Sequence, residues 1–486
     1  MKRFKFPSTA ALILAMLLIG AARAPAAPEI QLYLNGQPVA FDVVPQTVNS
    51  RVLVPLRGIF EALGARVAWY PTLSKAVFRW HLLDLHLEIG KKEFVLGGRR
   101  YQMDVAPYIE KGRTMVPLRL VSEVLLDADV RWDSHRKAVF IDLPPAPEVR
   151  EIPPGLAAAL AAAGAGDLVN IEDFPIMFLP EIRPQRRDGG GSLLFSDSPE
   201  YVDRPGILYK GTATGPVRLY YYHVNELERP ARVAVIAENT GSERARFTLY
   251  RQVTAAGGDW IRLGRKVVAG YLEEEEGKPA PKPVAEYTLA PGERVWLNQG
   301  PEFAPAPPGQ LLHGILEGKA GGALTFSFII LPEGEDPLAP DLPLEYLEPV
   351  RVHDRGTFPA DSRHLTVKAG SLGAVMLADW FSDPFLSGRD EVKGLPATLI
   401  GNYGLTYRLR VEFERPAFLL WAPVGGPHQG AVWVNGNVIQ APREYVEPYR
   451  QAVFLGLYPA GGRAEIRWMP PGGSWMPVEL VIIPEK

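Results

Sequence analysis

Three side chains that can ligate a metal alternate along one short segment: Asp84, His86 and Glu88. Alternate residues of a β-strand point to the same face, so these three would share one side. Carboxylate oxygens and an imidazole nitrogen are ligands of divalent metals. The intervening residues are leucines, so a strand with one buried and one water-facing side explains the same pattern. We favour this simpler interpretation and keep the three residues as candidate ligands.

A second acidic group, Asp379, Asp383 and Asp390, surrounds Trp380-Phe381. Oxygen-rich loops of this kind bind calcium in some proteins. The spacing matches no defined calcium loop such as the EF-hand. A structural calcium is therefore an open alternative, and the sequence predicts no cofactor and no catalytic residue.

Aromatic residues gather in the last part of the chain, where five of the ten tryptophans lie between residues 346 and 486. Trp433 and Trp475 are next to predicted turns, and an exposed indole there would stack on a sugar ring. Tyr220-Tyr221-Tyr222 lies in one predicted strand, so we expect at least one ring outside the core. Trp433, Trp475 and Tyr221 are thus candidate ligand-binding residues. Ordinary core packing also explains the tryptophans, and we favour it.

The elements that must position these residues are mostly short strands and turns. Glycine and proline number 47 each and cysteine is absent, which favours many turns and excludes disulfides. A net charge of −3 gives no electrostatic case for binding nucleic acid or an anionic membrane.

The N-terminus has the pattern of a secretory signal peptide. Basic residues in Met1–Lys5 precede the apolar run Ala10–Ile19 and the small residues around Ala24-Pro25-Ala26. We assign residues 1–27 to this signal. No later stretch reaches the ~18 consecutive apolar residues of a membrane span. The prediction is an extracytoplasmic protein, secreted or associated with the cell envelope, with no membrane span after cleavage.

An internal repeat follows. Val54-Pro55-Leu56-Arg57 recurs at 116–119 and Lys75-Ala76-Val77-Phe78 recurs at 137–140, both 62 positions later (117 − 55 and 137 − 75). A fixed period predicts two copies of one supersecondary unit. Each copy combines short strands with one helix that starts at the proline. In the first copy the apolar residues Leu56, Ile59, Phe60 and Leu63 form one helix face.

These motifs, Val-Pro-Leu-Arg before a short helix and then Trp and Lys-Ala-Val-Phe, resemble the copper amine oxidase N-terminal domain, or stalk domain, over about residues 29–143. The resemblance implies a non-catalytic appendage of exported bacterial proteins. The oxidase chemistry itself is excluded, because the family's catalytic domain needs His-x-His and Asn-Tyr-Asp/Glu. No His-x-His is present, and Gly404 replaces the acid after Asn402-Tyr403.

The predicted fold class is a mainly β, multidomain chain in which a duplicated α+β stalk-type module precedes two β-sandwich domains. The expected boundaries are a stalk domain at 28–143, a Pro/Ala/Gly-rich linker at 144–190, an immunoglobulin-like sandwich at 191–345 and a second sandwich at 346–486.

The predicted function is a non-catalytic, envelope-associated binding or scaffolding protein. The alternative is a carbohydrate-binding or carbohydrate-processing protein that uses the last sandwich. The expected partner of the protein is a cell-wall or surface polysaccharide, or another envelope protein.

Overall fold

A computed structural model describes most of the chain, in the ranges 30–48, 51–70, 73–120, 128–145, 148–274, 282–300, 303–340, 342, 344–349, 355–440 and 445–485. The predicted signal segment 1–27 lies outside these residues. The chain divides into two compact units, Met1–Leu63 with Met103–Pro145, and Gly64–Gln102 with Ala146–Lys486. The fold is mostly β with several sheets, as predicted. Among the described residues no helix is long and apolar enough to cross a membrane.

The described residues of the first unit include two four-stranded sheets and the short helix α1. Helix α1 (Leu56–Ala62) begins after Pro55 and buries Leu56, Ile59 and Phe60, which agrees with the predicted apolar face. The first sheet contains β12 (Asp129–Asp133), β13 (Ala138–Asp142), β1 (Gln31–Leu34) and β2 (Gln37–Val39). The second contains β10 (Tyr108–Glu110), β11 (Arg113–Pro117), β4 (Arg51–Pro55) and β3 (Gln46–Val48).

Segments 62 positions apart meet across this unit. Val54 pairs with Val116 in antiparallel register. Arg51 forms an ion pair with Asp104 and Arg113 forms one with Asp42, so the two pairs are reciprocal. The duplication itself stays a prediction from the sequence.

The segment between the two halves of the first unit forms a five-stranded meander that belongs to the second unit. Its strands are β5 (Arg66–Tyr70), β6 (Lys75–Trp80), β7 (Leu83–Glu88), β8 (Glu93–Leu96) and β9 (Arg99–Gln102). Leu82, in the β6–β7 turn, is buried in one apolar cluster with Phe418 and Ile483 of the C-terminal sandwich. The compact units therefore cut across the predicted domain 28–143, because the meander shares its core with later residues.

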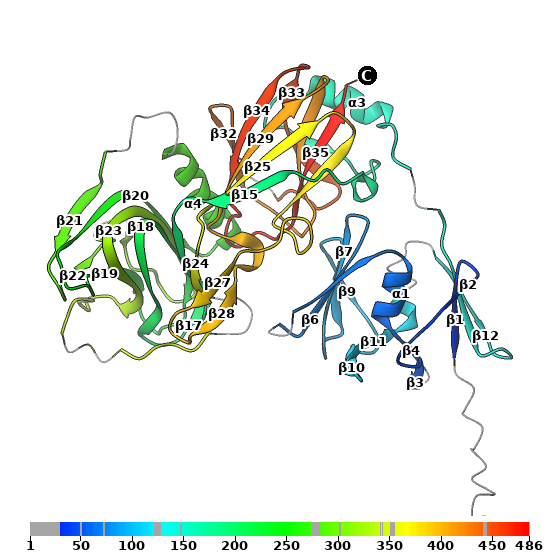
Figure 1. The fold of residues 1–486 in the computed structure, drawn as a ribbon, viewed down its shortest axis with the longest axis horizontal. Helices are drawn as coiled ribbons and strands as arrows, with labels where there is room; N and C mark the ends of the chain where they lie inside the picture. The colour runs from blue at the N-terminus through cyan, green and yellow to red at the C-terminus, as the bar shows by residue number, and fades with distance from the viewer. Residues whose placement is uncertain are drawn as a thin grey trace, which may run out of the picture. The chain divides into compact units, whose positions relative to one another are not determined.

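Two packed sheets form the C-terminal sandwich (Figure 1). The five-stranded sheet contains β14 (Leu168–Asn170), β33 (Gln451–Tyr458), β30 (Ala417–Pro423), β35 (Val478–Pro484) and β26 (Gly373–Leu377). The six-stranded sheet contains β15 (Gln185–Gly189), β25 (Ser362–Ala369), β29 (Thr406–Phe413), β34 (Arg463–Trp468), β31 (Ala431–Val434) and β32 (Asn437–Gln440). Residues such as Leu409, Trp421, Trp468 and Leu480 fill the space between them. Leu156 and Leu160 of helix α3 (Pro154–Ala162) pack in the cluster on the outer side of the five-stranded sheet.

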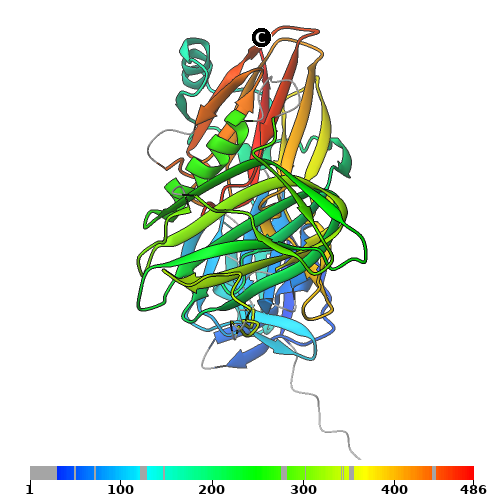
Figure 2. The same cartoon turned by 90° about the vertical axis from the view of Figure 1, so that its left-hand side faces the viewer.

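An eleven-stranded sheet is built on a long hairpin, β18 (Gly206–Asn225) with β23 (Leu311–Pro332). Its register breaks between Ala213 and Gly215, and different strands pair with β23 on either side of the break. The two parts of the sheet on either side of this break contact each other through Phe247 and Phe326, whose ring centroids are 5.3 Å apart. The long green strands face the viewer in Figure 2.

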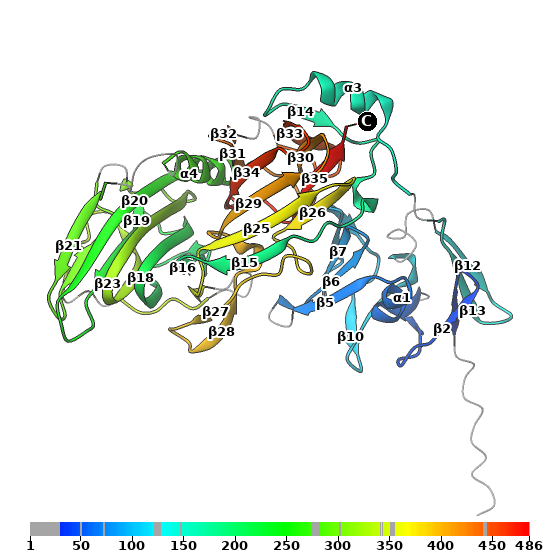
Figure 3. The ribbon, with the colours of Figure 1, turned by 45° about the horizontal axis from the view of Figure 1, so that its top comes forward.

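The other members of this sheet are β16 (Ser192–Ser196), β17 (Tyr201–Val202), β19 (Ala231–Glu238), β20 (Ala245–Gly257), β21 (Ala285–Leu289), β22 (Arg294–Trp296), β24 (Gly356–Phe358), β27 (Ser387–Asp390) and β28 (Leu395–Thr398). Helix α4 (Trp260–Glu274) lies beside β31 and β32 of the neighbouring sandwich (Figure 3).

Strands cross the boundaries that the sequence suggests. β14 and β15 lie in the predicted linker 144–190, and each pairs with a strand of the C-terminal sandwich. β24, β27 and β28 come after residue 346 yet complete the sheet of β16. The pairing partners of β14, β15 and β24 are distant in sequence, so no local pattern predicts these contacts, whereas β27 and β28 form a local hairpin that reaches the sheet through β24.

Candidate functional site

The first predicted group lies on β7, where Asp84, His86 and Glu88 alternate as expected. The His86 Nε2 atom is 3.9 Å from an Asp84 carboxylate oxygen. Glu88 instead forms an exposed ion pair with Lys91 at 2.8 Å. Among the described residues, no group of three or more His, Cys, Asp or Glu side chains is arranged to hold a metal ion.

Asp84 is engaged by an arginine that the sequence analysis did not single out. Arg79, on the neighbouring strand β6, donates two hydrogen bonds of 2.6 Å to the two Asp84 oxygens. The third nitrogen of the guanidinium group donates to Asp379. All three side chains are almost fully buried. The structure thus joins one acid from each predicted metal group around one buried cation.

The loop that carries Asp379 packs on the meander through aromatic contacts. The Trp380 ring centroid is 3.7 Å from that of Tyr70, and the Lys75 ammonium lies 5.6 Å from the Trp380 ring. Arg79 lies 5.1 Å from the Phe381 ring. These contacts add cation–π attraction to the ion pairs.

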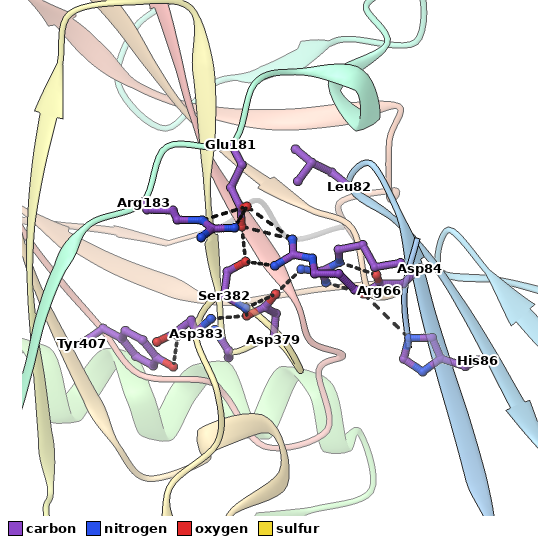
Figure 4. A network of polar contacts seen from close by, with 12 residues as sticks. Arg66, Leu82, Asp84, His86, Glu181, Arg183, Asp379, Ser382, Asp383 and Tyr407 are labelled. Carbon is purple, nitrogen blue, oxygen red and sulfur yellow. Dashed lines mark hydrogen bonds and ion pairs between the residues drawn. The ribbon is translucent and has the colours of Figure 1, made fainter. Parts of the chain in front are cut away.

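A second, more exposed arm of the network runs through Glu181 (Figure 4). Arg66 and Arg183 each lie 3.3 Å from a Glu181 oxygen. Ser382 donates a hydrogen bond to Glu181 and accepts one of 3.1 Å from Arg66. The loop and the meander are therefore joined at two points.

The remaining acids of the second group have separate partners. Asp383 accepts hydrogen bonds from Arg363 at 2.7 Å and from the Tyr407 hydroxyl at 2.6 Å. Asp390 accepts one of 3.2 Å from Arg355. Each acid therefore neutralises an arginine, and the three do not converge on one point.

The electrostatics of the meander follow from burial and from Arg79. Burial disfavours ionisation of Asp84, but the Arg79 guanidinium outweighs it and lowers the pKa of this carboxyl to about 2. Burial, aided by Lys75, lowers the pKa of His86 to about 4. Burial also lowers the pKa of Lys75 to about 8. At neutral pH His86 is thus an uncharged neighbour of an ion pair.

Glu479 is a buried acid that the sequence analysis missed. It lies on β35 and is fully buried, and neither carboxylate oxygen has a hydrogen-bond partner among the described residues. Burial raises its pKa well above the usual range, and the nearby Arg79 only partly opposes this. The sequence signal for this buried acid was a glutamate inside an otherwise apolar strand, Val478–Pro484.

The three aromatic candidates differ in exposure. Trp475 is 38% exposed and carries the Arg100 guanidinium 5.0 Å from its ring. Tyr220, Tyr221 and Tyr222 are all buried, so the expectation that one of them is exposed is wrong. Both faces of β18 are covered. Other strands of the eleven-stranded sheet pack on one face, and the C-terminal sandwich packs on the other.

Trp433 lines a groove of about 460 Å³ on the outer face of the six-stranded sheet. Its side chain is largely covered, since the Arg467 guanidinium stacks 4.2 Å from its ring. His364, Arg408 and Arg410 line the same groove. This groove therefore contains one of the three predicted ligand-binding residues, Trp433.

Comparisons with known proteins give one curated relative and one solved structure. A stretch of 97 residues is 26% identical to a protein named "Protease inhibitor" from Brevibacillus choshinensis, covering 20% of this chain and 30% of that protein. A solved structure, "Crystal structure of Lac15 from a marine microbial metagenome", aligns with 60% of this chain and 62% of that one at 12% identity. Its TM-score of 0.11 is too low to indicate a shared fold.

The copper amine oxidase N-terminal domain family matches residues 33–141. That range contains the Val-Pro-Leu-Arg and Lys-Ala-Val-Phe motifs and both flanks of the meander. The similarity to the copper amine oxidase N-terminal domain therefore covers one segment of this chain, residues 33–141.

Proposed function

We propose that this chain is a non-catalytic, exported protein that binds a partner at the cell envelope. The match of residues 33–141 to the N-terminal, non-catalytic domain of copper amine oxidases supports this proposal. The resemblance to a protein named as an inhibitor also favours a binding role.

The observation that carries the proposal is that the buried acidic residues are paired with arginine and tyrosine side chains. Asp84 and Asp379 share Arg79 in a buried cluster, and Asp383 is held by Arg363 and Tyr407. A general acid or base must reach its substrate, whereas these carboxylates are enclosed. Asp84 and Asp379 together join the meander to the loop after β26, and Asp383 joins that loop to the six-stranded sheet.

Carbohydrate binding is the second candidate, and the groove beside Trp433 favours it. Ligand sites are usually concave and combine a few polar groups with aromatic or apolar walls. The groove has an indole, arginines and a threonine in its lining.

The test is sedimentation of the purified chain, residues 28–486, with isolated envelope material. We expect the protein to sediment with the envelope and to appear in the extracytoplasmic fraction of cells. Release by soluble envelope polysaccharide would indicate a carbohydrate partner, and loss of binding after protease treatment of the envelope would indicate a protein partner. A protein that stays in the supernatant and in the cytoplasm would overturn the proposal. Point variants are needed here, because truncation at residue 345 would also remove β24, β27 and β28 from the larger sheet.

A further inference from the structure

No segment of chain joins the meander directly to the rest of the second unit. Both of its ends, at Gly64 and Gln102, continue into the first unit, and the second unit resumes at Ala146. Among the described residues, no strand of the meander pairs with a strand of another sheet. The meander is therefore held on the C-terminal sandwich by side-chain contacts and a few isolated hydrogen bonds, and it can separate from the sandwich with every strand of both parts intact.

The five-stranded sheet of the sandwich carries Glu479 on the face that the meander covers. Side chains alternate along β35, and Val481 and Ile483 lie in the apolar cluster that contains Leu82 of the β6–β7 turn. Glu479 comes two residues before Val481 and therefore points to the same face. Its pairing partners on both adjoining strands belong to the same cluster. The meander thus lies over a buried carboxyl group.

The groups around Glu479 leave this carboxyl without a hydrogen bond. Its side chain is fully buried, and neither oxygen has a partner among the described residues. On the meander, Arg79 favours ionisation of Glu479 and Asp84 opposes it, while two hydrogen bonds of 2.6 Å commit Arg79 to Asp84. On the sandwich, Tyr449 is the titratable neighbour, and its hydroxyl donates a hydrogen bond of 3.3 Å to the Leu82 carbonyl oxygen.

The two protonation states of Glu479 favour different arrangements of the meander. An ionised carboxylate without hydrogen bonds is costly to bury, so the docked form holds the neutral acid. Lifting the meander would admit water to Glu479, and in water this side chain ionises above its ordinary pKa of 4.5. The open form then releases a proton that the docked form keeps. Each pH unit above 4.5 therefore favours the open form up to about tenfold, until the pKa of the docked form is reached.

We propose that Glu479 makes the attachment of the meander pH-sensitive: as pH rises, ionisation of this side chain releases the meander from the five-stranded sheet. The release uncovers the apolar face around Leu82, while the meander and the sandwich each stay folded. This device belongs to the chain itself and goes beyond the binding role proposed above.

Other titratable groups of the meander set the pH range in which Glu479 acts alone. The pKa of Asp84 is lowered to about 2 because Arg79 outweighs the effect of burial, so Asp84 favours docking throughout the range above pH 3.8. Burial lowers the pKa of His86 to about 4 and also lowers that of His81, so both favour docking as pH rises to 6.5 and oppose Glu479 below that value. Burial lowers the pKa of Lys75 to about 8, so Lys75 favours docking only above pH 8. Between pH 6.5 and 8 the effect of Glu479 stands alone.

The test is hydrogen exchange of the full chain, residues 28–486, by mass spectrometry at pH 6.5, 7.0 and 7.5, with each rate divided by the intrinsic rate at that pH. The Leu82 amide, which donates a hydrogen bond of 2.9 Å to the Met177 carbonyl oxygen of the sandwich side, reports the release directly. We expect protection of β6, β7 and their turn to fall about five- to tenfold from pH 6.5 to 7.5. Glu479→Gln should abolish this fall, because glutamine carries no titrating proton. The matched control Glu465→Gln, an exposed acid on β34, should keep it.

Glu479→Leu is a second variant that removes the titrating group in a strand of apolar residues, and it should also give protection that does not change with pH. An equal fall in the wild type and in both Glu479 variants would overturn the proposal. Meander amides that exchange as slowly as those of β29 and β34 would overturn it as well, because the meander would then open only when the whole chain unfolds. The envelope sedimentation experiment tests the proposed function separately, and neither of these results changes its outcome.

Discussion

Glu479 illustrates how one side chain sets the pH dependence of this protein. Its carboxyl group is buried against Met376 and Ala422 of the adjoining strands, with no hydrogen-bond partner among the described residues. Its raised pKa means that the folded chain keeps a proton that the unfolded chain releases above pH 4.5. Stability is therefore fully present below pH 4.5 and is lost as pH rises toward the folded-state pKa, by up to about 1.4 kcal/mol per pH unit.

The variant Glu479→Gln should remove this contribution. Glutamine has nearly the same shape as glutamate and carries no titrating proton. We therefore expect the variant to be more stable than the wild type at pH 7, with a smaller difference between the two proteins at pH 4.5. Urea unfolding at pH 4.5, 6 and 7 measures the difference. The exposed change Glu465→Gln should keep the wild-type slope. A Glu479→Gln protein with an unchanged slope would contradict the assignment.

Arg79 is the residue on which the buried acids depend. Replacement by methionine would leave Asp84 and Asp379 buried without a counter-charge, which typically costs about 3–5 kcal/mol. We expect Arg79→Met to lower the free energy of unfolding by that amount. Lys91→Met, which breaks an exposed pair with Glu88 on the same meander, should cost less than about 1 kcal/mol. Chemical denaturation of both variants checks this, and similar losses in the two would show that Arg79 is not the central cation.

The sequence contained only part of this site. Arg79 and Asp84 flank one turn and pair directly across β6 and β7, so a hairpin prediction could have joined them. Asp379 lies 300 positions away from Arg79, and no local pattern connects the two. The sequence therefore offered the acids as two separate metal groups, while the fold uses them as partners of one arginine.

At the scale of elements, the loop between β26 and β27 packs against the meander. Trp380 is half-buried between Tyr70 on β5 and Phe385 of its own loop. Its indole also stands beside His86, with ring centroids 6.3 Å apart. The loop therefore stabilises three strands that come from the copper amine oxidase-type segment.

Removing the Trp380 ring should release the meander locally. Burying a whole aromatic ring is worth 3–5 kcal/mol, so for a half-buried indole we expect Trp380→Ala to cost about 2 kcal/mol. Hydrogen exchange should become faster in β5, β6 and β7, with little change in β29 and β34. Trp132→Ala, at an exposed position in the first unit, is the matched control. Uniform acceleration across the whole chain would argue against a local role.

Local turns were predicted more accurately than sheets. Asn-Gly is a strong local signal for a hairpin turn, and the hairpins at Asn35-Gly36 and Asn435-Gly436 have the positive φ angles that these residues favour. The membership of β14, β15 and β24 in their sheets was not predictable, because it depends on pairing between distant segments.

At the scale of the whole molecule, the predicted signal peptide leads to a simple measurement. If residues 1–27 are removed during export, protein from the extracytoplasmic fraction should begin near Pro28. Intact mass spectrometry and N-terminal sequencing of that fraction would show it. A chain in which Ala24 is replaced by a bulky charged residue should keep its full length, because the cleavage site needs small residues. A full-length mass outside the cell would contradict the prediction.

The place of β35 also governs when the chain can finish folding. This strand, Val478–Pro484, lies between β30 and β26 in the middle of its sheet rather than at an edge. Until it arrives from the ribosome or emerges from a translocation channel, two neighbouring strands lack a partner and the sandwich cannot close. Closure of this sandwich therefore depends on β35, however early the other strands of the sheet are available.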